Sequence, residues 1–209
     1  MPTRFKRKIR KALQNDFVKN ALRAFSSSYI ESREVAFAGK DFEQLQEEIV
    51  AIKESAQARL EELIKIFEKN ASARGSVVYH AANASDAVNL VIKIIRQHNA
   101  KKVIKSKSMT SEEIKLNEAL EQIGIEVIET DLGERIAQLA NEKPSHMVLP
   151  VIHQTRKEVA NIFSARLGKE VSPDIPRLVE EARNILRRDF LSADIGITGA
   201  NAVIAESAT

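Results

Sequence analysis

The sequence predicts an α/β fold in which a mainly parallel sheet is flanked by helices and preceded by an N-terminal helical region. Before Gly75, apolar residues recur at steps of three and four, as they do on one face of an amphipathic helix. After Gly75, short β-branched runs alternate with helical stretches, which is typical of βαβ units. We therefore expect N-terminal amphipathic helices in residues 1–75 and an α/β domain in residues 76–209, incomplete at its C-terminus.

The N-terminal region is expected to form helices over Phe5–Leu22 and Phe42–Phe67, joined by the polar stretch Ser26–Lys40. Six of the 32 lysines and arginines lie between Arg4 and Lys11, which leaves 26 basic against 29 acidic residues in the rest of the chain. No basic stripe interleaved with aromatic residues follows, so the basic segment is interpreted as the solvated face of a helix and no nucleic-acid partner is expected.

The α/β region is expected to contain five strands and four helices. The expected strands are Val77–His80, Val103–Lys105, Ile125–Glu129, Met147–Ile152 and Ile195–Thr198. The expected helices are Asp86–His98, Glu112–Ile123, Arg156–Leu167 and Ile175–Leu191.

Residues with known preferences for helix ends support these helices. Thr110 and Glu113 have the spacing of a capping box. Gly124 and Gly168 follow helical stretches, where a left-handed residue is favoured. Pro176 suits a first helical turn.

Composition limits the chemistry of the chain. It contains no cysteine, so it can form neither disulfides nor thiolate-ligated iron–sulfur clusters. No apolar run approaches the roughly 20 residues of a transmembrane helix, and the basic start lacks the apolar segment of a secretory signal. We therefore expect a cytoplasmic location and no transmembrane segment.

A candidate anion site lies where the strand at Val103–Lys105 is followed by a helix. The segment Lys105, Ser106, Lys107 and Ser108 brings lysines, hydroxyls and free backbone N–H groups to a helix start, which suits a phosphate or a small carboxylate. The alternative is that Ser108 or Thr110 caps the helix and the lysines are solvated.

Two further groups of polar residues follow strands. Glu129, Thr130 and Asp131 lead into an expected turn at Gly133 and could bind a hydroxyl or accept a proton, although a capping or turn role for Asp131 is the alternative. After a tight turn at Gly199 and within a second short apolar run, Asn201 and Glu206 could lie beside a ligand or serve ordinary turn chemistry.

The four histidines provide one candidate general base. His153 follows the strand expected around Pro150, and its position alone supports this role. His80, His146 and His153 could bind a metal with carboxylates, but their spacing is not that of a compact helical motif, so no metal is expected. No catalytic residue is assigned; His153, Glu129 and Asp131 are candidates.

The run KSKSMTSEEIKLNEALEQIGIEVIETDLGERIAQLANEKPSHMVLPVIHQTRKEVANIF closely resembles the lactate-utilisation (LUD) domain of the lactate-utilisation protein B iron–sulfur family. The segments RFKRKIRKALQNDFVKNALRAF, VVYHAANASDAVNLV and ADIGITGANAVIAES are also similar to that family. The positions that match the family motif are Lys105, Ser106, Lys107, Ser108, Glu112, Asn117, Glu129, Thr130, Asp131, Gly133, Glu134, His146 and His153.

The resemblance implies a fold similar to that of sugar-phosphate isomerases and coenzyme A transferases. It also implies a role in electron transfer during oxidation of L-lactate to pyruvate, together with other lactate-utilisation subunits and with a small carboxylate as ligand. The two [4Fe–4S] clusters of a full-length member are not expected in this chain, which we therefore expect to be a fragment or a short form and not an independent oxidoreductase. The alternatives are a stand-alone transferase or isomerase for a phosphorylated or coenzyme A substrate, and a non-catalytic partner-binding domain.

Overall fold

The computed structural model describes residues 3–209, and the backbone forms two compact units. One unit holds the chain up to Tyr79 together with Asn201–Thr209, and the other holds His80–Ala200. The division into domains of residues 1–75 and 76–209 remains a prediction. Among the described helices, none is both long and apolar enough to cross a bilayer.

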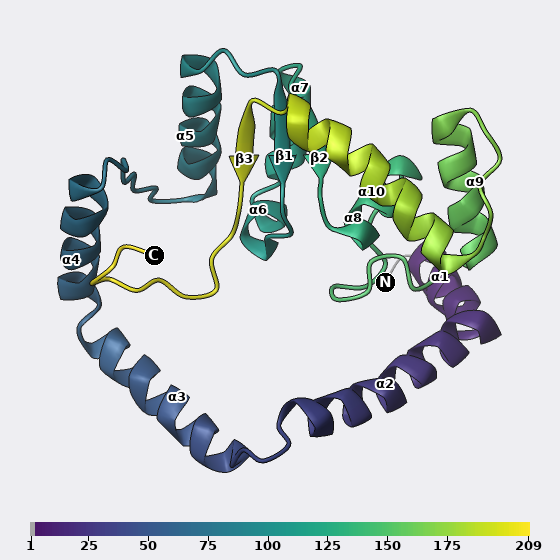
Figure 1. Cartoon of the computed structure of the whole chain (residues 1–209), viewed down its shortest axis with the longest axis horizontal. Coiled ribbons are helices and arrows are strands. Elements are labelled where there is room, and N and C mark those ends of the chain that lie inside the picture. The colour runs from purple at the N-terminus through teal and green to yellow at the C-terminus, as the bar shows by residue number, and fades with distance from the viewer. Residues whose placement is uncertain (1–2) are drawn as a thin grey trace. The chain divides into compact units, whose positions relative to one another are not determined.

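Among its described residues, the first unit contains four helices, which confirms the predicted N-terminal helical region (Figure 1). They are α1 (Thr3–Leu13), α2 (Asp16–Ala36), α3 (Phe42–Ala58) and α4 (Leu60–Ala73). Each of the two expected helices is divided in two. Asn15 begins α2 by accepting a hydrogen bond from the backbone N–H of Val18, and Arg59 ends α3 and precedes α4.

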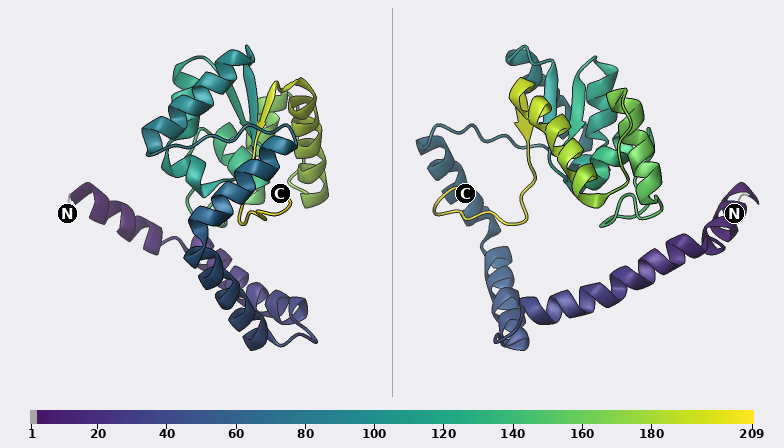
Figure 2. Two further views of the ribbon diagram at one scale, coloured as in Figure 1. Left: turned by 90° about the vertical axis from the view of Figure 1, so that its left-hand side faces the viewer. Right: turned by 45° about the vertical axis from the view of Figure 1, so that its right-hand side comes forward.

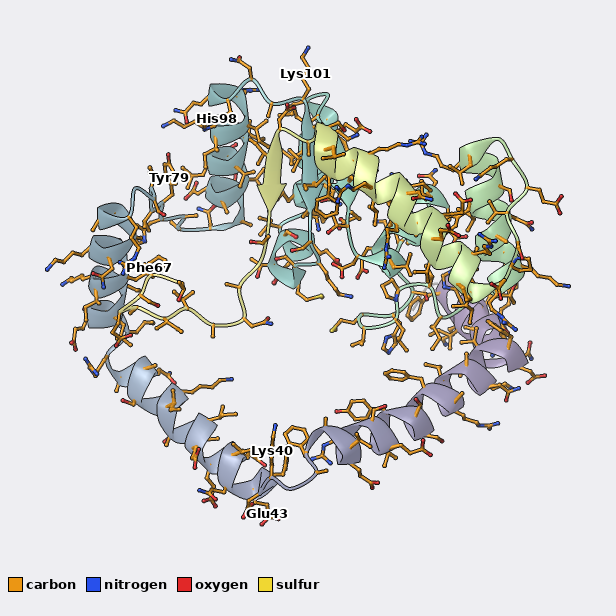
Figure 3. The ribbon with its side chains drawn as sticks, viewed as in Figure 1. Lys40, Glu43, Phe67, Tyr79, His98 and Lys101 are labelled. Carbon is orange, nitrogen blue, oxygen red and sulfur yellow. The ribbon has the colours of Figure 1, made fainter. Side chains whose placement is uncertain are left out.

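The polar connection predicted at Ser26–Lys40 is wrong, because α2 continues to Ala36. No glycine or proline interrupts the helix before Gly39, and Phe25 contacts Tyr29 one helical turn later, with ring centroids 6.2 Å apart. The true connection is short and contains Gly39 in the left-handed region (φ +73°). Figure 3 labels Lys40 and Glu43 at this turn.

The second unit is a three-stranded parallel sheet with flanking helices, which confirms the predicted fold class. Its elements are α5 (Ala84–Gln97), β1 (Lys102–Lys105), α6 (Met109–Glu113), α7 (Leu116–Gln122), β2 (Glu126–Glu129), α8 (Leu132–Leu139), α9 (Arg156–Leu167), α10 (Ile175–Ser192) and β3 (Ile195–Ile197). The strand order is β2-β1-β3, and β1 is parallel to both neighbours.

Helices cover both faces of this sheet, as two further views show (Figure 2). On one face, Val103 and Val127 pack with Ile95 of α5 and Leu120 of α7 in one apolar core. Successive strand residues point to opposite faces. Lys102 accordingly lies on the other face, where its ammonium group donates to Asp189 of α10 at 2.7 Å.

A second core joins α8, α9 and α10. Ile136, Phe163, Leu178 and Ala182 are buried together there. The helix α9 spans the predicted residues and begins with a capping box between Thr155 and Glu158. The predicted Gly168 ends it with φ +66°.

Two of the predicted strands are wrong. Val77–His80 forms no strand, and Val77 is 70% exposed, so this apolar pair is not buried in a sheet. Met147–Ile152 forms turns, with Met147 and Val148 both mostly exposed. Pro150 within that run has no N–H group to donate to a neighbouring strand, which explains why an apolar run here does not pair.

Three local predictions around the sheet edge are also corrected. The helix expected at Glu112–Ile123 is two helices, because Lys115 adopts a left-handed conformation (φ 55°) between α6 and α7. The helix start is capped by Ser108, whereas Thr110 lies inside α6. The turn expected at Gly133 is helical and belongs to α8.

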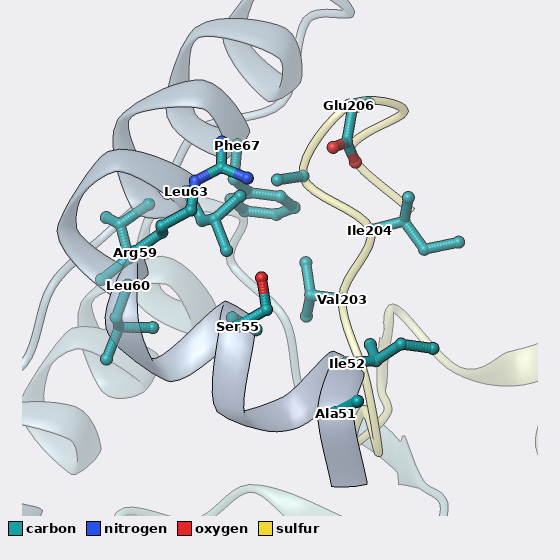
Figure 4. A pocket seen from close by; sticks show the side chains of 13 residues that line it. Ala51, Ile52, Ser55, Arg59, Leu60, Leu63, Phe67, Val203, Ile204 and Glu206 are labelled. Carbon is teal, nitrogen blue, oxygen red and sulfur yellow. The ribbon is translucent and has the colours of Figure 1, made fainter. Parts of the chain in front are cut away.

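The second apolar run after Gly199 forms no strand and packs within the first unit. Asn70 of α4 donates to the carbonyl groups of Ala205 and Glu206, both at 3.0 Å. This segment and helices α3 and α4 line a hollow of about 930 Å³ that includes Leu63, Phe67 and Val203 (Figure 4).

Candidate functional site

The parallel pairing of β1 and β2 brings the predicted polar segments together at the C-terminal ends of these two strands, which we call the sheet edge. Lys105 is the register partner of Glu129, so the residues after both strands begin at the same level. The backbone N–H of Thr130 then donates to the carbonyl of Lys105 at 2.9 Å, and the hydroxyl of Thr130 donates to the same carbonyl at 3.2 Å. The structure thus places Lys105–Ser108 beside Glu129–Asp131, because neighbouring parallel strands end on the same side of the sheet.

Lys105 is enclosed at this edge instead of reaching solvent. Its side chain is 1% exposed, and its ammonium nitrogen lies 2.9 Å from Glu129 Oε1. Asn117 of α7 donates to the same carboxylate oxygen at 2.6 Å. Lys105 therefore has a carboxylate partner within the protein, and its charge is balanced locally.

Lys107 is also paired, but it lies closer to the surface. Its ammonium group is 2.5 Å from Glu134 Oε1, and it donates to the carbonyl of Met147. The backbone N–H of Lys107 donates to Asp131 Oδ2 at 2.6 Å. Asp131 occupies the N-cap position of α8 without a capping hydrogen bond from its side chain, so its carboxylate fixes the neighbouring segment instead.

The two serines hold the backbone between β1 and α6. Ser106 donates its N–H to the carbonyl of Ile197 at 3.0 Å, which extends the β1–β3 pairing. Ser108 caps α6 by accepting from the N–H of Ser111 at 3.3 Å. Gly199 approaches so closely that a Cβ atom there would lie 3.1 Å from the Cβ of Ser108. The capping role of Ser108 is thus the alternative that the structure shows.

Two hollows adjoin this edge and share Glu112, Glu134 and Pro144. The smaller, of about 180 Å³, is also lined by Lys107, Met109, Ser145, His146 and Met147. The larger, of about 440 Å³, is also lined by Ser111, Asn117, Glu118, Glu121, Glu129, Ala137, Gln138, Asn141, Glu142 and Lys143. Of the two lysines predicted to bind an anion, Lys105 and Lys107, Lys107 lines one of these hollows.

His153 forms a hydrogen-bonded chain within the loop that precedes α9. Its Nδ1 lies 2.7 Å from the hydroxyl oxygen of Ser145, and its Nε2 lies 2.9 Å from Glu142 Oε2. The hydrogen bonds from His153 and Gln154 lower the pKa of the Glu142 carboxyl below its ordinary value. The proposed general base thus has two protein partners, which fix the orientation of its ring.

Two other histidines, His146 and His98, lie at positions that the structure defines. His146 Nδ1 accepts hydrogen bonds from the backbone N–H groups of Val148 and Leu149, both at 3.1 Å. His98 ends α5, as predicted (Figure 3). Across residues 3–209, no three histidine or carboxylate groups gather in a way that could hold a metal ion.

Asn201 and Glu206 belong to the first unit, whereas Lys105–Ser108 and Thr130 belong to the second. Glu206 lines the apolar hollow of Figure 4, opposite the labelled Arg59. Their part in a common ligand site with Lys107 remains a prediction.

Sequence reasoning gives no role to two residues that the structure makes central. Asn117 and Glu134 match motif positions, but only the fold shows that they contact Glu129 and Lys107. The signal that could have identified Glu134 is its i, i+4 spacing to Gln138, which puts both side chains on the same face of a helix. The side chain of Gln138 binds the backbone of β2, so this face is the one that meets the sheet. That spacing is informative only when Leu132–Leu139 is recognised as a helix.

Comparison with known proteins places this chain in a family. The family model described as the LUD domain matches residues 64–209. A protein named lactate utilization protein B from Macrococcus caseolyticus is 39% identical over 97% of this chain, and proteins of the same name from Geobacillus thermodenitrificans and Bacillus subtilis are 38% and 36% identical. The chain spans 43% of the length of each of these relatives. No solved structure matches. The family model covers more than half of the residues, and the chain therefore belongs to the LUD domain family.

Proposed function

We propose that this chain is the LUD-domain part of a lactate-utilisation protein and acts with other subunits in the oxidation of L-lactate to pyruvate. The supporting observation is the 36–39% identity to proteins named lactate utilization protein B over 97% of the chain. Electron transfer in this proposal requires clusters held outside this chain, because residues 1–209 contain no cysteine to ligate them.

The ligand proposed for this domain is a small carboxylate held near Lys107, with Lys105, Ser106, Ser108 and Thr130 shaping the site. Lys107 supports this proposal because its side chain is 27% exposed and lines the 180 Å³ hollow. Lys105 is buried and paired with Glu129, so we assign it the role of fixing the ends of β1 and β2, while Lys107 contacts the ligand. A carboxylate would replace Glu134 as a partner of the Lys107 ammonium group.

The ligand proposal is tested by isothermal titration of the chain with lactate, pyruvate and inorganic phosphate. We expect lactate or pyruvate to bind and Lys107→Gln to weaken that binding, because the variant removes the positive charge from the hollow. Lys101→Gln is the matched control, since Lys101 is exposed at the opposite end of β1 (Figure 3). Binding of phosphate alone would favour a phosphorylated substrate, and equal loss in both variants would contradict a site at Lys107.

The proposed association with other subunits is tested separately by affinity purification of the tagged chain from its own cells. We expect other lactate-utilisation proteins to co-purify with it. Their absence, under conditions in which they are expressed, would contradict the subunit role while leaving the ligand test unaffected.

A further inference from the structure

The helix α1 combines an apolar face with a strongly basic one. Phe5, Ile9 and Leu13 are spaced four residues apart, so they lie within an arc of about 80° along one side of the helix. All the other positions from Arg4 to Lys11 are lysine or arginine, six in number, and α1 contains no acidic residue. The first helix of the chain is therefore a basic amphipathic helix.

The apolar face of α1 is exposed together with the basic one. The exposed fractions of Phe5, Ile9 and Leu13 are 45%, 42% and 67%. The basic side chains that the structure describes are exposed as well, and no ion pair between described residues involves them; they are Lys6, Arg7, Arg10 and Lys11. An amphipathic helix whose basic face is merely solvated packs its apolar face against the rest of the protein. The described residues do not cover the apolar face of α1 in this way.

The combination of apolar and positively charged side chains specifies the class of partner. Such a partner must cover three apolar side chains and also balance a concentrated positive charge. Nucleic acid supplies negative charge, but its phosphate backbone leaves the apolar side chains in water. The α1 helix of a second copy would bring like charges together. An anionic phospholipid surface meets both requirements, because its headgroups attract lysine and arginine and its acyl chains accept the apolar face.

We propose that α1 binds the surface of a membrane that contains anionic phospholipids. Phe5, Ile9 and Leu13 enter the boundary between headgroups and acyl chains, and the basic side chains contact the negatively charged headgroups. With 11 residues, α1 is about 16 Å long, which is far shorter than the roughly 30 Å hydrocarbon core of a bilayer. The helix therefore lies along the surface and does not cross the membrane. This proposal concerns the first unit and does not depend on a ligand at Lys107.

Co-sedimentation of the full chain with two kinds of vesicle tests the proposal. One kind is pure phosphatidylcholine, and the other contains about 30% phosphatidylglycerol, which supplies the negative surface potential. We expect the mixed vesicles to bind the chain at least about tenfold more tightly, since each lysine or arginine near an anionic surface strengthens binding about fivefold. Binding to the mixed vesicles should also fall as sodium chloride is raised, because salt screens the attraction between the helix and the headgroups.

A fluorescent probe reports whether the apolar face enters the membrane. The chain contains no tryptophan, so Phe5→Trp places a single indole on this face of α1. We expect its emission to shift to shorter wavelength when mixed vesicles are added, because the ring leaves water for an apolar environment. A helix that is held by its charges alone would leave the emission unchanged.

A charge variant with a matched control assigns the electrostatic contribution to α1. The combination of Lys6→Gln, Arg10→Gln and Lys11→Gln removes three exposed positive charges and should weaken binding to the mixed vesicles at least about tenfold. The control lowers the net charge of the chain by the same amount at exposed arginines of α10, and should bind as the wild type does; it combines Arg183→Gln, Arg187→Gln and Arg188→Gln.

An apolar variant tests the other face of α1 without removing charge. Ile9→Gln combined with Leu13→Gln should weaken vesicle binding at least about tenfold, because two apolar side chains no longer leave water. Glutamine is a good helix former, so α1 should remain helical, which circular dichroism checks. The control is Ile175→Gln with Leu191→Gln, an exposed isoleucine and leucine at the two ends of α10, and it should bind as the wild type does.

The opposite results would overturn the proposal. These results are no sedimentation with the mixed vesicles, equal binding to pure phosphatidylcholine, an unchanged tryptophan emission, or losses in the control variants as large as those in the α1 variants. Two further arms identify another occupant of the apolar face. Binding of a mixed-sequence DNA duplex without binding of vesicles would point to nucleic acid, and self-association that Ile9→Gln with Leu13→Gln abolishes, again without vesicle binding, would point to a second copy. None of these measurements involves lactate or other subunits, so their failure is distinguishable from failure of the proposed function.

Discussion

Lys105 and Glu129 lie directly opposite each other at the ends of two parallel strands, and their side chains form an ion pair of 2.9 Å that is almost fully enclosed. The pairing register therefore places two opposite charges at the same level of the sheet. Each would be costly alone in this environment, because an unpaired buried charge loses its hydration without compensation. A change in the register of β1 and β2 would therefore separate this pair and move the residues of the candidate site.

Removing one member of this pair is expected to be more harmful than removing both. Lys105→Met leaves Glu129 buried without its partner and should lower the free energy of unfolding by about 3–5 kcal/mol. The double variant Lys105→Met with Glu129→Leu should recover much of that loss. Urea unfolding of the three proteins measures the difference. A single variant as stable as the double variant would show that the pair is not coupled.

Gly133 is expected to resist replacement even by alanine. A Cβ atom at this position would lie 2.9 Å from Pro150 Cδ, so the loop that follows α8 would have to move. We expect Gly133→Ala to lower the free energy of unfolding by about 1–3 kcal/mol, as overpacking does elsewhere.

The control for Gly133 is Gly196→Ala in β3, where an added methyl group would lie 4.0 Å from its nearest neighbour, Ile104 Cγ1. Thermal or urea unfolding compares the two variants. If Gly196→Ala is as destabilising as Gly133→Ala, contact with Pro150 is not the cause.

Asp194 should contribute to the acid sensitivity of the second unit. Its carboxylate accepts hydrogen bonds from the backbone N–H groups of Lys101 and Lys102 at 2.8 and 2.9 Å, and these bonds lower its pKa below the ordinary value of 3.8. Because the folded-state pKa is depressed, the stabilisation is fully present above pH 3.8 and is lost as the pH falls through the folded-state pKa.

The difference in unfolding free energy between the wild type and Asp194→Ala should therefore be constant above that range and shrink below it. Urea unfolding at a series of pH values measures this difference. Asp86→Ala is unsuitable as a control because Asp86 takes part in the start of α5, whereas Glu113→Ala changes an exposed carboxylate without these backbone contacts. A difference that grows on acidification would contradict the assigned sign.

Asn70 is expected to hold the segment after Gly199 against α4. Asn70→Ala removes both hydrogen bonds to the carbonyl groups of Ala205 and Glu206, so amide hydrogen exchange in residues 203–206 should become faster. Lys69→Ala is the control, because Lys69 is the exposed neighbour in the same helix. Unchanged exchange in Asn70→Ala would mean that apolar contacts in the hollow of Figure 4 hold the segment by themselves.

The success of sequence-based prediction here follows from the range of the interactions involved. The helix α9 is predicted with its true ends, and Gly168 at its C-terminal end is a local signal. Val103–Lys105 and Ile125–Glu129 are recognisable because buried parallel strands are short, apolar and β-branched. Met147–Ile152 has the same composition, yet it forms turns, because a strand also needs a neighbour with matching hydrogen-bonding groups.

The α/β class, the lack of cysteine chemistry, the family and the two polar segments that follow β1 and β2 can all be read from the amino-acid sequence, since they depend on composition, periodicity and motif. The folded chain alone reveals that Lys105 is buried beside Glu129, that Lys107 lines a hollow beside Glu134, and that Asn117 donates to the buried carboxylate of Glu129. Charge balance and burial depend on contacts between side chains that are far apart in the sequence, and the spacing of residues along the chain does not predict those contacts.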